Sequence, residues 1–450
     1  MRPPRPPARG PKAREPAAGT AARAAATALL AAVLDNGRSF DALLEPGALP
    51  SFDALDGRDR RLAHAIAATA LRRHGTIGKA LDRLIERRPR RAGRLFRVME
   101  IAAAQILFMD VPDHAAVSVA LDQLADDRDA VHFKPLANAV LRRLARERDT
   151  TLAGLDDPGL DTPDWLWRRW VAAYGEETAR AIAAAHRLEP TLDISVKSDA
   201  AGWAEKLGGS VLPTGSVRLI PSGPVEDLVG YNDGEWWVQD AAAALPARLL
   251  GNVAGRRVAD LCAAPGGKTA ALAQAGARVT AVDVASQRLA RLAANLQRLR
   301  LTAELVTADV LSWSPGEAFD AVLLDAPCTA TGTIRRHPDI PWLKRPEDVA
   351  ALADLQRRML KRAVAMLKPG GRLVFCTCSL EREEGEDQIA ALLADHPRLR
   401  LSPVAAEEIG GLTEVLAPSG TVRTLPNHLA GPSPRLSGLD GFFIARLEKS

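Results

Sequence analysis

Cysteine is scarce in this sequence of 450 residues, and none of it lies in the first half of the chain. A disulfide-stabilised secreted scaffold would be smaller and richer in cysteine. No two cysteines have the two-residue separation typical of structural zinc sites, so we expect no metal. The four residues therefore indicate reduced thiols in a cytoplasmic protein: Cys262, Cys328, Cys376 and Cys378.

Long apolar runs are also missing. No segment approaches the roughly 20 apolar residues that cross a bilayer. The run 24–34 follows a basic start, as in a signal peptide, but it continues directly into Asp35-Asn36-Gly37-Arg38. It therefore predicts a buried helix, and we expect no membrane association.

The net charge of +4 hides an uneven distribution. Residues 1–150 contain 26 Lys and Arg against 18 Asp and Glu, whereas residues 151–450 contain 33 against 37. A basic first third indicates a module that binds a polyanion. Its densest part has seven arginines within fifteen residues, from Arg83 to Arg97. A solvated face is the alternative, but guanidinium groups are preferred phosphate partners, so we expect RNA contacts from Arg87, Arg88, Arg90 and Arg91.

The organisation of the chain follows from its local patterns. Residues 1–19 are rich in proline and arginine and are expected to be a disordered basic tail. Apolar residues at spacings of three and four predict an all-α bundle of five to seven helices over 20–150. Residues 151–245 read as a connecting α+β subdomain, and from 246 to 450 strands alternate with helices of 10–20 residues. That alternation predicts a doubly wound, mostly parallel sheet.

Chemically informative residues stand where the expected strands end. Strands are expected at 258–262, 278–283, 304–309, 319–325 and 372–378. The first ends in Cys262-Ala263-Ala264-Pro265-Gly266-Gly267-Lys268, the next three in Asp283, Asp309 and Asp325, and the fifth in Cys376-Thr377-Cys378. Because doubly wound sheets bind ligands at the carboxyl ends of their strands, this set predicts a pocket for a nucleoside cofactor.

Within this pocket the glycines allow a close approach of the backbone to the ligand, and Asp283 is placed to bind ribose hydroxyls. The spacings typical of NAD and ATP loops are absent. Lys268 could steady the cofactor or a phosphate, or be a surface lysine at a helix start. Arg288 could contact the cofactor or be solvated. The expected cofactor-binding residues are Cys262, Ala263, Ala264, Pro265, Gly266, Gly267, Lys268, Asp283, Arg288, Asp309 and Asp325.

Several long motifs resemble the S-adenosylmethionine-dependent RNA cytosine-5 methyltransferases. They are Cys262–Thr269, Asp325-Ala-Pro-Cys328 with Thr331–Asp339, Thr377-Cys378-Ser379, Val238-Gln239-Asp240 and Leu439–Phe443. The helical part, with Asn138–Arg143, looks like a NusB-type RNA-binding domain. This pairing is similar to the Fmu/Sun group of bacterial 16S ribosomal RNA (cytosine-5)-methyltransferases, and it implies a Rossmann-like class I methyltransferase domain with S-adenosyl-L-methionine as cofactor.

The chemistry of cytosine methylation requires a thiolate near the cofactor, because addition at C6 makes C5 nucleophilic. Spacing alone leaves Cys328 and Cys378 open as the nucleophile. The resemblance implies Cys378, with Cys328 assisting product release, and Asp325 is placed to bind the edge of the base. Cys262 and Cys376 are expected to be small buried side chains rather than catalysts.

The loop after Asp325 is long and therefore a candidate functional segment. We expect Arg335 and Arg336 to meet RNA phosphates, and His337 to be structural or to position the substrate. The implied partner is 16S ribosomal RNA, naked or in an early assembly intermediate, bound by a monomer. A transfer RNA cytosine-5 methyltransferase and a non-catalytic RNA-binding assembly or antitermination factor are the alternatives.

Overall fold

The computed structural model describes residues 19–221 and 223–450. The chain forms two compact units, which divide between Asp157 and Pro158. All but the last residue of the expected basic tail lies outside the described residues. The boundary falls within the expected connecting region, so the extent of a separate subdomain at 151–245 stays a prediction.

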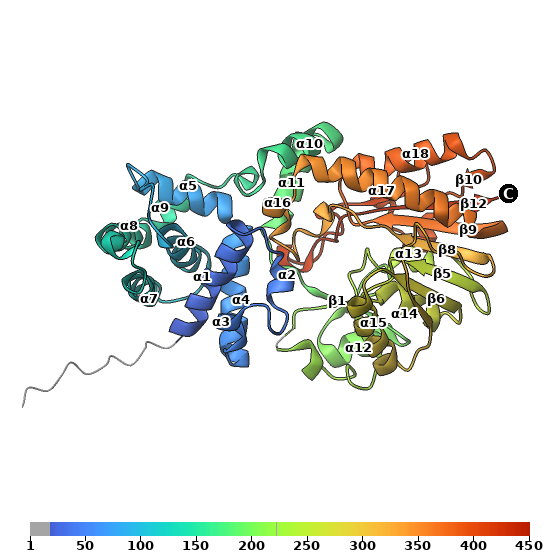
Figure 1. The fold of residues 1–450 in the computed structure, drawn as a ribbon, viewed down its shortest axis with the longest axis horizontal. Helices are drawn as coiled ribbons and strands as arrows, with labels where there is room; N and C mark the ends of the chain where they lie inside the picture. The colour runs from blue at the N-terminus through green and yellow to red at the C-terminus, as the bar shows by residue number, and fades with distance from the viewer. Residues whose placement is uncertain (1–18, 222) are drawn as a thin grey trace, which may run out of the picture. The chain divides into compact units, whose positions relative to one another are not determined.

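The first unit is helical throughout its described part (Figure 1). Helix α6 is its centre, since 11 of its 14 residues are buried and it contacts α1, α4, α5, α7 and α8. Such a helix is apolar over most of its surface because neighbouring helices cover most of its sides. The helices are α1 Thr20–Leu34, α2 Phe40–Leu43, α3 Pro50–Asp53, α4 Gly57–Arg72, α5 His74–Leu84, α6 Leu95–Phe108, α7 Asp113–Ala125, α8 Lys134–Arg146 and α9 Arg148–Ala153.

Two buried polar pairs fix helix α1 within this bundle. Nε of Arg23 donates to Oε1 of Gln105 at 2.7 Å, and Oγ1 of Thr27 donates to Oε1 of Gln123 at 2.9 Å. Buried polar groups are costly unless they are hydrogen-bonded, so these pairs specify how α1 packs on α6 and α7.

The second unit begins with two helices and a small antiparallel sheet of order β2-β3-β1-β4. The ion pair between Arg218 and Asp193 is buried within this sheet, at 2.7 Å. The elements are α10 Asp164–Tyr174, α11 Glu176–His186, β1 Leu192–Val196, α12 Ala200–Leu207, β2 Ser210–Val211, β3 Val217–Leu219 and β4 Trp236–Val238.

A larger sheet follows, with strand order β10-β12-β9-β8-β5-β6-β7 and β11 paired with β12. Strands β5 to β9 are parallel, and β12 is antiparallel to its neighbours. The expected mostly parallel sheet is therefore confirmed. Its elements are α13 Leu245–Arg248, β5 Arg257–Leu261, α14 Gly267–Gln274, β6 Arg278–Asp283, α15 Ser286–Leu299, β7 Glu304–Thr307, β8 Phe319–Asp325, α16 Ile340–Leu343, α17 Pro346–Ala365, β9 Leu367–Thr377, α18 Glu386–Asp395, β10 Leu399–Leu401, β11 Val422–Thr424 and β12 Phe442–Lys449.

Both faces of this sheet are covered, as its nearly continuous apolar strands require. Alternate residues of β5 show the division, because Val258 packs in one core with α13 and α14, and Ala259 packs in the other with α17 and α18. The chain leaves β5 toward β6 on one side and returns to β8 on the other. The crevice at the carboxyl ends of β5 and β8 is therefore the switch point at which such sheets bind ligands.

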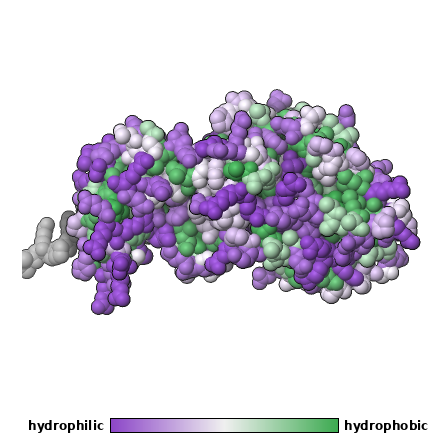
Figure 2. Space-filling view, turned by 90° about the horizontal axis from the view of Figure 1, so that it is seen from above, coloured by the Kyte–Doolittle hydropathy of each residue, from purple (hydrophilic) through white to green (hydrophobic). Residues whose placement is uncertain are grey.

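The surface in the view of Figure 2 is largely hydrophilic, with hydrophobic residues in small separate areas. Within residues 19–221 and 223–450, no helix combines the length and apolar character needed to cross a bilayer. In the same described part of the chain, His, Cys, Asp and Glu side chains form no group of three that could hold a metal ion.

Candidate active site

A cavity of about 500 Å³ opens at the carboxyl ends of β5, β6, β7 and β8. Six residues expected to bind the cofactor line it, together with both candidate catalytic cysteines. The expected residues that line this first cavity are Cys262, Ala264, Asp283, Arg288, Asp309 and Asp325.

Asp283 is fixed at the inner wall of the first cavity and is only 2% exposed. Its carboxylate accepts backbone hydrogen bonds from Ala264 at 3.2 Å and Ala285 at 3.0 Å. Arg288 approaches the same oxygens at 2.8 and 3.0 Å, with its own side chain 55% exposed. Arg288 thus neutralises Asp283 from the solvent side. Asp309, in the loop two residues after β7, is exposed and accepts from the Leu311 amide at 2.9 Å.

The glycine-rich turn borders both the first cavity, through Cys262 and Ala264, and a neighbouring one. Ala263, Pro265, Gly266, Gly267 and Lys268 line a second cavity, of about 550 Å³. Gly266 has φ +104°, and a Cβ on it would lie 2.7 Å from Cγ of Leu292, so only glycine fits. The turn therefore forms the wall between two cavities rather than the floor of one.

The two cavities meet at the expected catalytic residues. Asp325 and Cys378 line both, whereas Cys328 lines the first. The Sγ atoms of Cys328 and Cys378 lie 3.4 Å apart. Strand β9 ends at Thr377, one residue earlier than expected, which releases the side chain of Cys378 from the register of buried Cys376.

Proximity raises the pKa of the Cys328 thiol well above its usual value. The hydrogen bond with Cys378 is the largest cause, followed by burial and by the nearby carboxyl of Glu384. The two thiols thus form one hydrogen-bonded pair, and either of them can be the donor.

Lys268 and Asp325 form an ion pair at the junction of the cavities, with Nζ 2.7 Å from Oδ2. Burial alone would lower the pKa of Lys268, but the charge of Asp325 outweighs it and raises this pKa above its usual value. The ring of Phe442 lies 5.3 Å from the same ammonium. Lys268 is therefore a permanent cation that faces the second cavity, not a surface lysine.

The remaining cysteines have the surroundings of unreactive thiols. Cys376 is fully buried, and its Sγ lies 3.4 Å from Oδ1 of Asp325. Burial, and then nearby carboxylates such as Asp325, raise the pKa values of both Cys376 and Cys262. Neither becomes a thiolate readily, in keeping with the expected structural role.

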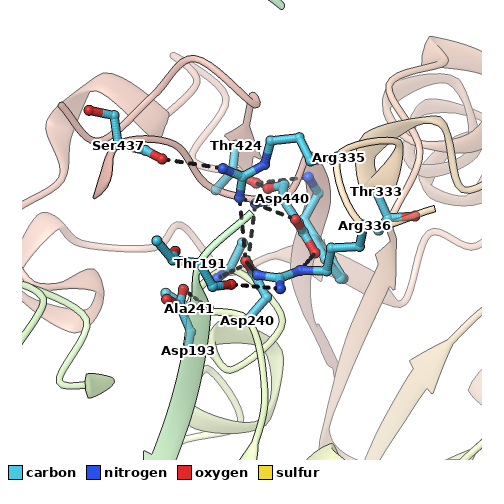
Figure 3. A network of polar contacts seen from close by, with 12 residues as sticks. Thr191, Asp193, Asp240, Ala241, Thr333, Arg335, Arg336, Thr424, Ser437 and Asp440 are labelled. Carbon is cyan, nitrogen blue, oxygen red and sulfur yellow. Dashed lines mark hydrogen bonds and ion pairs between the residues drawn. The ribbon is translucent and has the colours of Figure 1, made fainter. Parts of the chain in front are cut away.

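Arg335 and Arg336 form ion pairs with carboxylates of the catalytic domain (Figure 3), and Arg335 is buried whereas Arg336 keeps 21% of its side chain exposed and lines the second cavity. Arg336 contacts Asp240 at 2.6 Å and Asp440 at 2.9 Å, and Arg335 contacts Asp440 at 3.3 Å. Burial would raise the pKa of Asp240, but Arg336 and Arg335 outweigh it and lower the value to about 2.

The expectation that Arg335 meets phosphates is corrected, because this side chain is only 3% exposed and is paired with carboxylates, whereas the expected contact of Arg336 with RNA stays a prediction. The network joins three motifs that are far apart in the sequence: Val238–Asp240, Thr331–Asp339 and Leu439–Phe443. It holds the loop after Cys328 against the small sheet, and the neighbouring His337 lines the second cavity.

The arginine cluster of the first unit divides into two kinds. Arg88 pairs with Asp82 at 2.6 Å and stacks on Phe96. Arg94 pairs with Asp127, and Arg97 with Asp35 and Glu100, so these side chains support the bundle. Arg83 is exposed and donates to the Gly154 carbonyl at 2.8 Å, and the other exposed members of the cluster, for which the structure shows no such ion pair, are Arg87, Arg90 and Arg91.

Several lining residues were missed from the sequence. In the first cavity Val284 is 66% exposed directly after Asp283, and α17 adds Leu355 and Met359. In the second cavity Gln239 and Phe442 belong to motifs that had carried no assigned role. Their positions in those motifs could have indicated a role for Gln239 and Phe442. The sequence around the residues of α17 has no feature that predicts a place in the cavity.

Comparisons with known proteins agree with this geometry. A family described as "16S rRNA methyltransferase RsmB/F" matches residues 247–448, and the NusB family matches residues 20–146. Ribosomal RNA small subunit methyltransferase B of Sodalis glossinidius is 36% identical over 95% of this chain and 97% of its own length. The protein of the same name from Xylella fastidiosa is 36% identical over 96% of this chain and 98% of its own length.

A solved structure titled PH0851 is similar to nearly the whole chain. It has a TM-score of 0.73 and 25% identity, and the match covers 96% of this chain and 99% of that one. The full-length likeness to the two relatives, with both expected domains in order, shows the family. The chain belongs to the 16S rRNA methyltransferase RsmB/F family.

Proposed function

We propose that Cys378 is the nucleophile of this enzyme and that Cys328 assists release of the product. As a member of its family, the chain is an S-adenosylmethionine-dependent 16S rRNA cytosine methyltransferase. The observation that supports the proposed roles is the pair of Sγ atoms, 3.4 Å apart, at the junction of the two cavities.

The first cavity fits the cofactor. A buried carboxylate at Asp283 suits ribose hydroxyls, and the exposed apolar Val284 beside it suits the face of a nucleobase. We propose that Asp283, Arg288 and Asp309 hold S-adenosylmethionine there, with Cys262, Ala264 and Asp325 lining the same space. The bound cofactor supplies an electrophilic methyl group on its sulfonium sulfur.

We assign the second cavity to the target cytidine, because only there do Cys378, Asp325 and Lys268 face a common space. Cys378 loses its proton and its Sγ bonds to C6 of the cytosine, which makes C5 nucleophilic. C5 then bonds to the methyl carbon as the bond from that carbon to the sulfonium sulfur breaks, and the sulfur leaves as a neutral thioether. A base then removes the C5 proton, the C5–C6 double bond returns and the C6–S bond breaks, which restores the thiolate. The target base reaches this cavity by flipping out of its stack.

Lys268 and Asp325 assist the addition in this proposal. The ammonium donates to an acceptor on the pyrimidine, and the carboxylate accepts from the amino group at the ring edge. Their 2.7 Å contact keeps both groups in place before the base enters, so little reorganisation is needed. Lys268 is thereby reassigned from the cofactor to the base.

Further features of the proposal concern the partner. We propose that residues 20–150 and 151–245 bind RNA, with Arg87, Arg90 and Arg91 as direct phosphate contacts and Arg88 as a partly occupied fourth. The enzyme acts in the cytoplasm as a monomer on naked 16S rRNA or an early assembly intermediate, where the target cytidine is still accessible. Light scattering of the free protein and methylation of naked rRNA against assembled subunits test these points.

Two single substitutions test the roles of the cysteines. Cys378→Ala abolishes methylation and forms no adduct. Cys328→Ala traps a covalent protein–RNA adduct, which migrates slowly on a denaturing gel. An adduct with Cys378→Ala and none with Cys328→Ala would reverse the assignment.

A further inference from the structure

Glu384 is a buried carboxyl group that the proposed chemistry does not use. It ends the short turn Arg382–Glu384 after β9 and has no exposed surface. Burial raises its pKa, and the hydrogen bonds that it accepts oppose this shift. Each of its side-chain partners is an uncharged hydrogen-bond donor. Hydrogen-bond geometry, rather than an ion pair, therefore holds the carboxyl group in place.

The first group of contacts reaches the segment that carries Cys328. The backbone N–H of Thr329 donates to Oε1 at 3.0 Å and to Oε2 at 3.2 Å, and the Thr329 hydroxyl also donates to Oε2. Gln356 donates from Nε2 to Oε1 at 3.1 Å and to the carbonyl of Pro327 at 2.9 Å. Glu384 therefore fixes the residue after Cys328 directly and the residue before it through Gln356.

The second group of contacts reaches the segment that carries Cys378. Oγ of Ser379 donates to Oε2 at 2.5 Å and lies 3.1 Å from Oγ1 of Thr329. The carbonyl of Glu384 also accepts from the Thr377 hydroxyl at 2.9 Å. One residue thus binds the neighbours of both cysteines.

We infer that Glu384 is a positioning residue, whose carboxyl group clamps Thr329 and Ser379 so that Sγ of Cys328 stays beside Sγ of Cys378 through the catalytic cycle. This inference rests on the roles proposed above for the two cysteines. Cys378 directly follows strand β9 and is also held through its carbonyl, which accepts from the Gly332 amide at 2.9 Å. Cys328 lies on a loop, so loss of Glu384 displaces Cys328 more than Cys378.

The expected defect is therefore in product release. In Glu384→Ala, Cys378 still adds to the base, but the displaced Cys328 assists elimination poorly, and covalent protein–RNA adduct accumulates as it does in Cys328→Ala. The value of kcat falls about a hundredfold, the loss typical of an ångström-scale misplacement, with KM for RNA unchanged. A merely structural role would lower activity without any adduct.

The conservative variant separates geometry from charge. In Glu384→Gln the amide oxygen can accept from Thr329 and Gln356, and the amide N–H groups can donate to the hydroxyls of Thr329 and Ser379, which rotate to accept. It therefore restores turnover and removes the adduct. Glu383→Ala is the matched control, since Glu383 is adjacent but pairs with Arg169 at the surface, and it leaves both readouts unchanged.

The experiment measures kcat, KM and adduct on rRNA for wild type, Glu384→Ala, Glu384→Gln, Glu383→Ala, Cys328→Ala and Glu384→Ala with Cys378→Ala. The adduct of Glu384→Ala must vanish in the double variant. If Cys328→Ala traps adduct but Glu384→Ala does not, or if Glu384→Gln fails to restore turnover, the clamp is wrong. If Cys328→Ala itself traps none, the proposed cysteine roles fail instead.

Folding of the variants is checked by thermal unfolding and by S-adenosylmethionine binding. Should Glu384→Ala not fold, Thr329→Val and Ser379→Ala remove one hydroxyl each and give the same adduct in smaller amounts. Absence of adduct in both of these folded variants would equally contradict the clamp.

Discussion

The ammonium nitrogen of Lys268 lies 2.7 Å from Oδ2 of Asp325, at the point where the two cavities of the catalytic domain meet. The lysine stands at the start of α14, in a turn whose sequence predicts contact with the cofactor. Its side chain faces the other cavity, and the ion pair neutralises Asp325 where the base is proposed to bind.

The position of Lys268 predicts that its replacement lowers turnover without weakening the binding of the cofactor. Lys268→Met removes the proposed donor to the base and leaves the carboxylate of Asp325 without its cation, so kcat falls about a hundredfold or more. Affinity for S-adenosylmethionine, measured by calorimetry, stays near that of wild type, whereas Asp283→Ala weakens it at least about tenfold. A large loss of cofactor affinity in Lys268→Met would support the original assignment of Lys268 to the cofactor.

Asp260 predicts a pH dependence of stability. Burial raises its pKa to about 7, although Thr269 donates to it at 2.6 Å. Because the folded state keeps this proton where the unfolded state has lost it, the free energy of unfolding falls as pH rises from about 4 to about 7 and then levels. Asp260→Asn removes this contribution, so the variant gains stability relative to wild type at pH 8 by at most roughly 4 kcal/mol, and little at pH 4.

Urea unfolding of wild type and Asp260→Asn at pH 4 and pH 8 measures this difference. Thr269→Ser is a suitable control, because it keeps the hydroxyl that donates to Asp260. An equal stability difference at both pH values would show that Asp260 titrates normally in the folded protein.

The network of ion pairs around Arg336 predicts a loss of stability when this residue is replaced. Arg336→Gln leaves Asp240 and Asp440 buried with one guanidinium group instead of two, which costs about 3–5 kcal/mol. Chemical denaturation measures the loss, and Arg435→Gln is a control in an exposed pair with Glu189. If Arg336→Gln were as stable as wild type yet bound RNA weakly, the expectation from the sequence would be supported instead.

The exposed arginines Arg87, Arg90 and Arg91 of the first unit predict a measurable dependence of RNA affinity on salt concentration. Replacing Arg87, Arg90 and Arg91 together by Gln weakens RNA binding and lowers the slope of log K against log salt concentration by about 2, as expected for three phosphate contacts to single-stranded RNA. The matched control replaces Arg94 alone, since Arg94 pairs with Asp127. An unchanged slope in the triple variant would assign the cluster to a solvated face.

Much of the fold could be predicted from the sequence because its local patterns are strong. The strands Arg278–Asp283 and Phe319–Asp325 have the predicted bounds, since each is a short, largely apolar run between turn residues. The strand predicted at 304–309 is shorter in the structure, because it ends at Thr307 and leaves Asp309 in the loop. Strands β10 to β12 were not predicted, since they pair with one another or with β9 across long separations in sequence.

The sequence by itself determined the chemistry of the site: which cysteines, carboxylates and glycines stand at strand ends, and hence a nucleoside cofactor and a thiol nucleophile. The tertiary structure alone decided which cavity each residue faces. The pairing of Lys268 with Asp325 and of Arg336 with Asp240 and Asp440 depends on contacts across 57 to 104 positions. Local sequence patterns do not predict such contacts, because a side chain becomes buried or paired with an opposite charge only when distant segments pack together.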